Sequence, residues 1–274
     1  MKLALCNEVL RDHPFEEQCA HAATLGFDGL ELAPFTLAQD PATLTAEDAV
    51  RVRRAMEAEG LVCCSLHWLL AAPEGLSITT DDPGIRVRTI ALMERLVGFA
   101  AEVGAGVLVH GSPQQRVLPV DDEAASRARG LAYFAAAGEA AAKAGVRYLI
   151  EPLARTETAF INTVTEAEAI VREVGSKGLA TMIDTCATAN IGVDVVATID
   201  AHLPGGQVAH IHVNDPNRRG PGEGALDFAP IIGALRRQDY AGWISAEPFI
   251  YKPTGLACAA RAAGVLCALT GKTL

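Results

Sequence analysis

The sequence predicts an α/β protein, a (β/α)₈ or TIM barrel that forms a single domain over residues 1–274. Three observations lead to this fold class. Eight short apolar runs alternate with stretches of helical pattern, glycines recur just before the runs, and 274 residues suit one barrel of about 250 residues. Apolar strands separated by helices imply a parallel sheet that is covered on both faces.

The expected strands are the apolar runs, and most of the later ones lead directly into a histidine or an acid. In chain order they cover residues 3–6, 27–32, 61–66, 106–109, 146–150, 179–183, 208–212 and 243–246. The expected helices cover residues 14–25, 45–59, 82–103, 122–144, 165–174, 193–202, 228–237 and 256–269, and the fifth opens at Thr165 or its neighbour. Thr45 and the Asp82-Pro83 pair are typical helix starts. Glycines typical of helix C-termini precede several runs: Gly26, Gly60, Gly104, Gly145, Gly178 and Gly242.

An open, doubly wound sheet is the alternative arrangement for alternating strands and helices. Such sheets often carry a G-x-G-x-x-G fingerprint after the first strand, and the sequence has none there. The count of eight units favours closure into a barrel.

Composition narrows the class of partner. The formal net charge of −10 argues against nucleic-acid binding, which requires clustered lysine and arginine. No apolar run reaches the roughly 18 residues of a membrane span, and no signal peptide is visible at the N-terminus. The seven cysteines form no C-x-x-C pair, and the adjacent Cys63 and Cys64 would face opposite sides of a strand. We therefore expect a reduced, cytoplasmic protein without a membrane segment.

Ionisable residues stand at the ends of the later runs: His67, His110, Glu151, Asp184, His212 and Glu247. A lone histidine at a strand end is more often a structural residue than a ligand. Glu151 and Glu247 are harder to explain as structural residues. Each follows a strongly apolar run, and a buried carboxylate needs a partner or a cation.

Four of these residues follow one another at successive strand tips: Glu151, Asp184, His212 and Glu247. The carboxyl ends of parallel strands meet at one mouth of a barrel, where such proteins place their chemistry. Three carboxylates brought together there would repel one another, and a divalent cation removes that conflict. Oxygen ligands with one imidazole suit Mn²⁺, Co²⁺, Mg²⁺ or Zn²⁺. The four residues are therefore the expected metal ligands.

At these residues the chain resembles the xylose isomerase-like superfamily of TIM barrels. Within it, the sugar phosphate isomerase/epimerase group is similar, in particular the ketose 3-epimerases and the hydroxypyruvate isomerases. The likeness covers essentially the whole chain and is most specific in its second half. The motifs that carry it are the E-P-L-A-R-T-E segment at 151–157, Asp184-Thr185, His212 with Arg218, and Glu247-Pro248-Phe249.

The resemblance implies roles for these residues. Glu151 and Glu247 would be both metal ligands and the catalytic acid and base. Glu157 and Arg218 would bind the substrate, and His67 and His110 are expected beside them at the rim. His210, which precedes the ligand, is interpreted as a supporting residue. Dimers and tetramers are common in the resembled families, so a homo-oligomer is also an expectation.

One position departs from the family pattern. The ketose 3-epimerases carry a histidine three residues after the metal aspartate, where it helps to hold the substrate oxygens. Here that position is Ala187. The departure leaves the expected metal site intact and puts ketose 3-epimerase activity itself in doubt.

The expected function is that of a metal-dependent sugar isomerase or epimerase. A divalent ion bound to adjacent carbonyl and hydroxyl oxygens makes the neighbouring C–H more acidic, and a carboxylate moves the proton through a metal-stabilised enediolate. The candidate substrates are a small ketose, a keto-inositol or a hydroxypyruvate-like acid.

Three alternatives come from other classes. A dehydratase of the inosose or dehydroshikimate type would use the same metal chemistry to expel water. An endonuclease IV-type AP endonuclease shares the fold, but it needs a histidine at Ala187 and an Asp-x-His after the seventh strand, and residues 216–224 contain no histidine. The third is a catalytically silent protein that only binds a metal.

Overall fold

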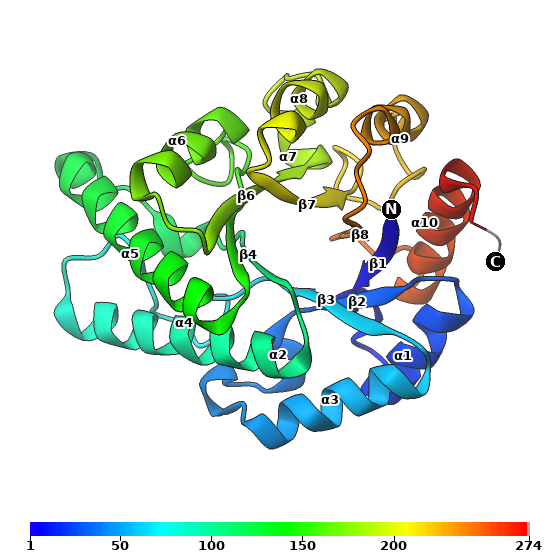
Figure 1. The fold of residues 1–274 in the computed structure, drawn as a ribbon, viewed down its shortest axis with the longest axis horizontal. Helices are drawn as coiled ribbons and strands as arrows, with labels where there is room; N and C mark the ends of the chain where they lie inside the picture. The colour runs from blue at the N-terminus through cyan, green and yellow to red at the C-terminus, as the bar shows by residue number, and fades with distance from the viewer. Residues whose placement is uncertain (273–274) are drawn as a thin grey trace.

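The computed structural model describes residues 1–272, which form one closed barrel of parallel strands surrounded by helices (Figure 1). Each strand pairs with its neighbours in the sequence, and β1 pairs with β8, so the sheet has no open edge. The strands are β1 (Lys2–Cys6), β2 (Gly29–Leu32), β3 (Val62–Leu66), β4 (Val107–His110), β5 (Arg147–Ile150), β6 (Leu179–Asp184), β7 (Val208–Val213) and β8 (Trp243–Ala246). The predicted barrel is confirmed.

Helices cover the outside of the barrel. They are α1 (Phe15–Thr24), α2 (Pro34–Leu37), α3 (Ala46–Ala58), α4 (Pro83–Val103), α5 (Glu123–Ala144), α6 (Val164–Val174), α7 (Thr185–Asn190), α8 (Val195–His202), α9 (Phe228–Arg237) and α10 (Gly255–Thr270). Both expected N-caps are confirmed. Thr45 exchanges hydrogen bonds with Asp48 in a capping box, and the Asp82 side chain accepts from the backbone N of Ile85 at 2.9 Å.

Most helix starts lie within one residue of the expectation, but α8 starts two residues later, and the short α2 and α7 were not expected. The helix expected to open at Thr165 or its neighbour begins at Val164, and Thr163 and Glu166 form a second capping box at its start. The helix expected at 193 begins after Asp194, which caps it. The short α7 was not expected, and Asp184 caps it through a hydrogen bond from the backbone N of Ala187. In α6, α7 and α8 the capping side chain belongs to the residue directly before the first helical residue.

Alternate residues of each strand face the helices or the barrel axis, as the two-residue period of a strand requires. Leu108, Tyr148 and Ile150 belong to the large core between strands and helices. Their neighbours Val109 and Leu149 belong to a separate small cluster that faces the axis. This alternation decides which residues after each strand reach the mouth of the barrel.

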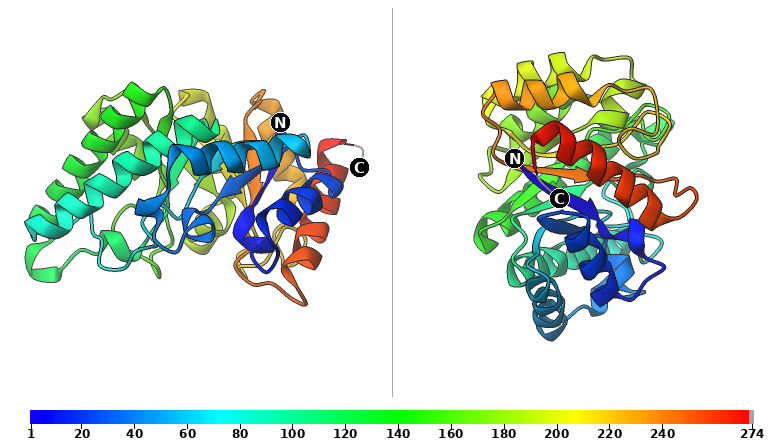
Figure 2. Two further views of the ribbon diagram at one scale, coloured as in Figure 1. Left: turned by 90° about the horizontal axis from the view of Figure 1, so that it is seen from below. Right: turned by 90° about the vertical axis from the view of Figure 1, so that its right-hand side faces the viewer.

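The last helix closes the structure against the first segment of the chain. Figure 2 shows α10 in red beside the blue N-terminal segment, and α10 contacts the 3-10 turn η1 (Asn7–Leu10) that follows β1. None of the helices among the described residues is long and apolar enough to cross a membrane.

Candidate metal centre and active site

Four strand ends bring three carboxylates and one imidazole together at the carboxyl-terminal mouth of the barrel. One potential ligand atom of each lies within 4.8 Å of those of the other three, and all four side chains are buried. Asp184 and His212 are register partners on β6 and β7, while the two glutamates directly follow β5 and β8. We call these residues the inner cluster: Glu151, Asp184, His212 and Glu247.

His212 is held from behind by a carboxylate. Its Nε2 lies 3.0 Å from Oε1 of Glu31, a fully buried residue of β2, and a carboxylate can only accept, so Nε2 carries a proton. Its Nδ1 lies 2.9 Å from Oε2 of Glu247 and 3.5 Å from Oε1 of Glu151, but it is aligned for a hydrogen bond with no group of the described residues. Burial opposes a charged ring, yet Glu247 and Glu31 raise the pKa of His212 well above its usual value. Nδ1 is therefore the nitrogen that would exchange a proton for a cation.

Without a cation, the negative charges of the carboxylates in the inner cluster repel one another. Burial first, and then the charges of Glu151 and Glu247, raise the pKa of Asp184 well above its ordinary value. Burial likewise raises the pKa of Glu151. Glu247 differs, because the charge of His212 and a hydrogen bond from His67 overcome burial and lower its pKa to about 2.

The residues present fit a divalent cation. Two buried polar atoms of the inner cluster, Oδ2 of Asp184 and Nδ1 of His212, have no hydrogen-bond partner within residues 1–272. Buried polar atoms without partners are rare and call for an explanation such as an ion. Three carboxylates and an imidazole, without a thiolate, form a donor set suited to Mn²⁺, Co²⁺, Mg²⁺ or Zn²⁺.

A chain of buried charges leads from the inner cluster toward β1. Nδ1 of His67 lies 2.9 Å from Oε1 of Glu247, and Nε2 of His67 lies 3.0 Å from Oε2 of Glu8. Both ring nitrogens therefore donate to carboxylates. Burial alone would lower the pKa of His67, but the charge of Glu8 and the hydrogen bond to Glu247 raise it to about 10. His67 is a buried cation that orients Glu247.

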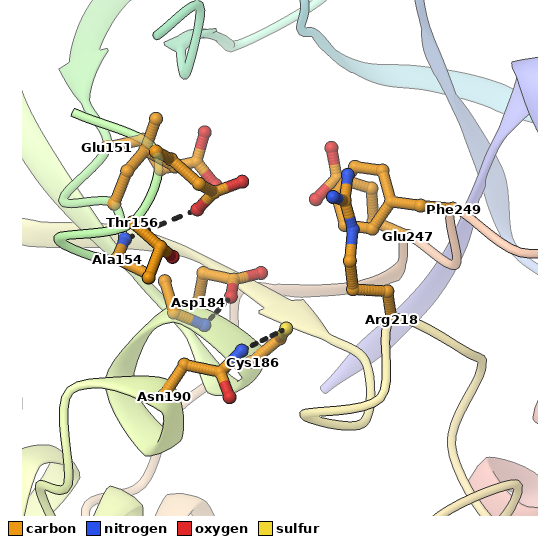
Figure 3. Close-up of a pocket in the computed structure, with 12 residues that line it drawn as sticks. Glu151, Ala154, Thr156, Asp184, Cys186, Asn190, Arg218, Glu247 and Phe249 are labelled. Atoms are coloured by element: carbon orange, nitrogen blue, oxygen red, sulfur yellow. Dashed lines mark hydrogen bonds between the residues drawn. The ribbon is translucent and has the colours of Figure 1, made fainter.

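The cavity beside the inner cluster, which we call the inner cavity, has a volume of about 80 Å³. Figure 3 shows Glu151 and Asp184 on one side of it and Glu247 with Arg218 on the other. Glu157 and Arg218, the expected substrate-binding residues, both line this cavity.

Arg218 is held in place by its contacts with the segment after β8. Its carbonyl oxygen accepts from the backbone N atoms of Phe249 and Ile250 at 2.9 and 3.0 Å. Its guanidinium lies 4.8 Å from the ring centroid of Phe249, a cation–π contact. Its φ of 67° lies in the left-handed region, which non-glycine residues rarely adopt and which tends to persist at functional sites.

Ala187, the position that departs from the family pattern, lies on the wall of the inner cavity beside Cys186 and Asn190. Its backbone N donates to Oδ1 of Asp184 at 2.5 Å, so the main chain orients this acid. The methyl side chain offers no hydrogen bond to a substrate.

His67 and His110 do not lie at the rim, where we expected them. His67 is 1% exposed and His110 is fully buried, and neither lines the inner cavity. His110 shares its face of β4 with Leu108 and points outward, toward Phe134 of α5. Its Nδ1 lies 2.7 Å from the hydroxyl of Tyr148 on the neighbouring strand β5. Burial lowers the pKa of His110 well below its usual value.

Gly111, not His110, takes the inward position after β4. A Cβ built on Gly111 would lie 1.6 Å from Oε2 of Glu151. Only glycine leaves room there for the Glu151 carboxylate.

Sequence reasoning gave no role to three residues that support the site. Glu31 binds both His212 and His210, the latter at 2.8 Å through Nε2, which agrees with a supporting role for His210. The signal was a carboxylate inside an apolar run. Glu8 supports His67, and fully buried Arg116 donates from Nη2 to the backbone O of Glu151 at 2.8 Å. No pattern distinguishes Arg116 from an ordinary loop arginine.

The fold and the inner cluster define the class: a parallel (β/α)₈ barrel with carboxylates and an imidazole convergent at its carboxyl-terminal mouth. The chain belongs to the xylose isomerase-like TIM barrel family, whose model matches residues 19–267.

Curated relatives of the chain are epimerases and isomerases. A D-psicose 3-epimerase of Agrobacterium fabrum is 26% identical over 234 residues, which cover 83% of this chain and 77% of the relative. A 2-oxo-tetronate isomerase of Cupriavidus necator is 28% identical over 252 residues, or 88% of each chain. The chain is an isomerase or epimerase of this family. A solved 3-keto-D-glucoside 4-epimerase from E. coli shares the fold, with a TM-score of 0.82, 20% identity and 99% of each chain covered.

Proposed function

We propose that the protein is a divalent-metal-dependent sugar isomerase or epimerase that moves a proton at the carbon beside a carbonyl. One observation carries the proposal. Glu151 and Glu247 both line the inner cavity and both belong to the inner cluster, so each is able to face a substrate carbon held at that cluster. The names of the curated relatives, epimerases of ketoses and an isomerase of 2-oxo-tetronate, support the same reaction class.

The inner cluster would hold the cation, which when bound supplies Lewis-acid polarisation of a substrate carbonyl. The chain's own groups then handle the proton. One glutamate takes it from the carbon, and the other returns it, to the opposite face for epimerisation or to the neighbouring carbon for isomerisation. General acids and bases of this kind contribute about 10²–10⁴-fold each.

The walls of the inner cavity orient the substrate in this proposal. Arg218 donates hydrogen bonds and Glu157 accepts them, so together they bind hydroxyls or an adjacent oxygen-rich group. His67 acts indirectly, by orienting Glu247. It binds Oε1 of Glu247, while Oε2 of the same carboxylate lies beside His212 in the inner cluster. His110 has no role in this proposal.

Deuterium uptake from D₂O tests the proposal. Mass spectrometry would follow ketoses, keto-inositols, hydroxypyruvate and 2-oxo-tetronate incubated with protein and Mn²⁺. We expect incorporation that a chelator abolishes and that Glu151→Gln and Glu247→Gln each reduce by about 10²–10⁴-fold. Glu94→Gln, which alters an exposed glutamate of α4, is the control. Exchange that survives in both active-site variants would overturn the assignment.

The same experiment, with a parallel assay on abasic DNA, separates the alternatives, which the comparisons do not favour. A dehydratase would give a product lighter by one water. A metal-dependent AP endonuclease would leave the sugars unlabelled and cleave the DNA in the parallel assay.

A further inference from the structure

A second, larger cavity adjoins the inner cavity. Its volume is about 460 Å³, within the range of roughly 300–1,000 Å³ usual for ligand sites, whereas the inner cavity has only about 80 Å³. The two share Arg218 and Phe249 as a common wall. We call this space the outer cavity. Most of the room for a substrate therefore lies outside the reaction centre.

Aromatic rings form much of the outer cavity. Phe35, Trp68, Phe249 and Tyr251 line it, and they come from the segments that follow β2, β3 and β8. Trp68 and Phe249 meet edge to face, with ring centroids 6.2 Å apart. The negative face of an aromatic ring attracts C–H groups that carry partial positive charge, as those of a sugar ring do.

Polar groups of both kinds face the same space. Glu8 lines the outer cavity and is 4% exposed, and its Oε1 has no hydrogen-bond partner in the described part of the chain. Arg11 and Arg218 also line it, and each stacks on an aromatic ring: Arg11 lies 5.9 Å from the centroid of Tyr251. The cavity thus offers donors from two guanidinium groups and an acceptor from one buried carboxylate.

A hydroxylated ring suits this set better than an anion does. A hydroxyl donates and accepts, so it satisfies both Glu8 and the arginines. A phosphate or carboxylate would pair with the arginines, but it brings negative charge and only acceptors toward Glu8.

Two residues that line the outer cavity also have an unusual backbone conformation. Trp68 and Arg218 have φ values of 52° and 67°. Non-glycine residues in the left-handed region are held there by their surroundings and cluster at ligand sites.

We propose that the outer cavity is a second sugar subsite, so that the preferred substrate is a keto-sugar that carries a further glycosyl residue. This inference rests on the proposed function, since it assumes that the inner cavity receives the reacting keto-sugar.

Three groups of probes share the reacting end of fructose and differ only in what they carry beyond it. Fructose carries nothing, isomaltulose and maltulose carry a glucosyl residue on O6 or O4, and fructose 6-phosphate carries an anion. With Mn²⁺ present, we expect kcat/KM for deuterium exchange to be at least about tenfold higher for a glucosyl fructose than for fructose, the effect of one good hydrogen bond. Equal values for fructose and both glucosyl fructoses would overturn the proposal, and so would a preference for the phosphate.

Variants of the outer cavity locate the effect. Of the two cavities, Tyr251 and Arg11 line only the outer one. Tyr251→Ala and Arg11→Ala should therefore bring the ratio of kcat/KM for a glucosyl fructose to kcat/KM for fructose toward one. Arg127→Ala is the matched control, because Arg127 also stacks on a ring, Phe160, but lines neither cavity. A ratio that stays high in both outer-cavity variants would contradict the assignment.

Binding distinguishes failure of the subsite from failure of the proposed function. Calorimetry of the Mn²⁺-loaded protein measures Kd for each probe whether or not exchange occurs. If neither these probes nor the keto-inositols, hydroxypyruvate and 2-oxo-tetronate of the first test exchange, the proposed function fails. The subsite still stands if a glucosyl fructose binds at least about tenfold tighter than fructose and Tyr251→Ala removes that gain. Equal Kd values overturn it.

Discussion

Gly111 leaves the space that is occupied by Glu151, a candidate catalytic residue. In Gly111→Ala, the new methyl carbon would lie 1.6 Å from Oε2 of Glu151, so the two atoms could not both keep their positions. The end of a flexible side chain moves more readily than backbone, so we expect the fold to survive and the carboxylate to leave the inner cluster. Metal affinity, measured by titration with Mn²⁺, should fall by about 10–100-fold or more.

Gly98→Ala provides the control for Gly111→Ala. Gly98 lies in α4, and a Cβ there would meet nothing within 4 Å. It should leave metal affinity unchanged. Full affinity in Gly111→Ala would show that Glu151 is not a ligand, or that it reaches the ion from elsewhere.

Asp184 and Glu247 should respond in opposite ways to loss of charge. The raised pKa of Asp184 means that its ionised form destabilises the metal-free protein, so Asp184→Asn should raise the melting temperature measured with chelator. The lowered pKa of Glu247, about 2, means that its ionised form stabilises the fold above its unfolded pKa, and that this stability is lost as pH falls toward 2. Glu247→Gln should therefore lower the same melting temperature.

The same shifts set the pH dependence of metal binding. Both the raised pKa of Asp184 and the raised pKa of His212 make protons compete with a cation, so Mn²⁺ affinity should weaken as the pH is lowered. Calorimetry in buffers of different ionisation enthalpy counts the released protons. An affinity that does not change with pH would contradict this competition at both residues.

Ala187 is where the chain leaves the pattern of the ketose 3-epimerases, and it lines the inner cavity. A substrate hydroxyl left without its partner costs about 1–3 kcal/mol. Wild type should therefore turn over free ketohexoses poorly, and Ala187→His should raise their kcat/KM by roughly tenfold or more. Efficient wild-type turnover that Ala187→His fails to improve would mean that this position has no bearing on specificity.

At the scale of elements, strands and helices were largely predictable, because each has a local signal. Apolar runs marked the strands, and the expected range 228–237 coincides with α9 (Phe228–Arg237). The start of α6 was predicted to within one residue, whereas α8 starts two residues later than expected, because its cap Asp194 lies inside the expected range. The short α7 has too few residues for a helical period to be visible.

The direction of a side chain at a strand end was not predictable in the same way. β4 is apolar on both faces, as strands of parallel barrels are, so its sequence does not say whether His110 or Gly111 faces the mouth. The four residues of the inner cluster were predictable because their strand ends follow one another in the chain. Glu31 and Glu8 act across the barrel on residues far away in sequence, and no local pattern carries that pairing.

Glu31 links β2 to β7, and its loss should be felt at the inner cluster. It is fully buried and lies within hydrogen-bond distance of Nε2 of both His210 and His212. In Glu31→Gln the amide still fills the space, but one histidine loses its acceptor. We expect Mn²⁺ affinity to fall by about 10–100-fold, as for other partners of metal-binding histidines. Unchanged affinity would show that strand geometry alone orients His212.

At the scale of the whole molecule, a bound cation should govern stability. The protein carries a formal net charge of −10, and the inner cluster concentrates three of its acids in one buried place. Mn²⁺ at about 100 times its Kd should stabilise the fold by about 2.7 kcal/mol, and a chelator should reverse the rise in melting temperature. Asp184→Asn should abolish the response, and a response that persists there would place the ion at another site.

His67 touches a carboxylate at each end, and the two carboxylates belong to different cavities. Glu8 forms part of the wall that would recognise the far end of a substrate, and Glu247 is a candidate to act on the near end. The imidazole of His67 therefore connects a residue of the outer cavity directly to a residue of the inner cluster. A substitution at Glu8 that changed specificity would also change the surroundings of Glu247, the candidate for proton transfer. Changes at Glu8 and Glu247 should therefore not combine additively, because neither can be altered without changing what holds the other.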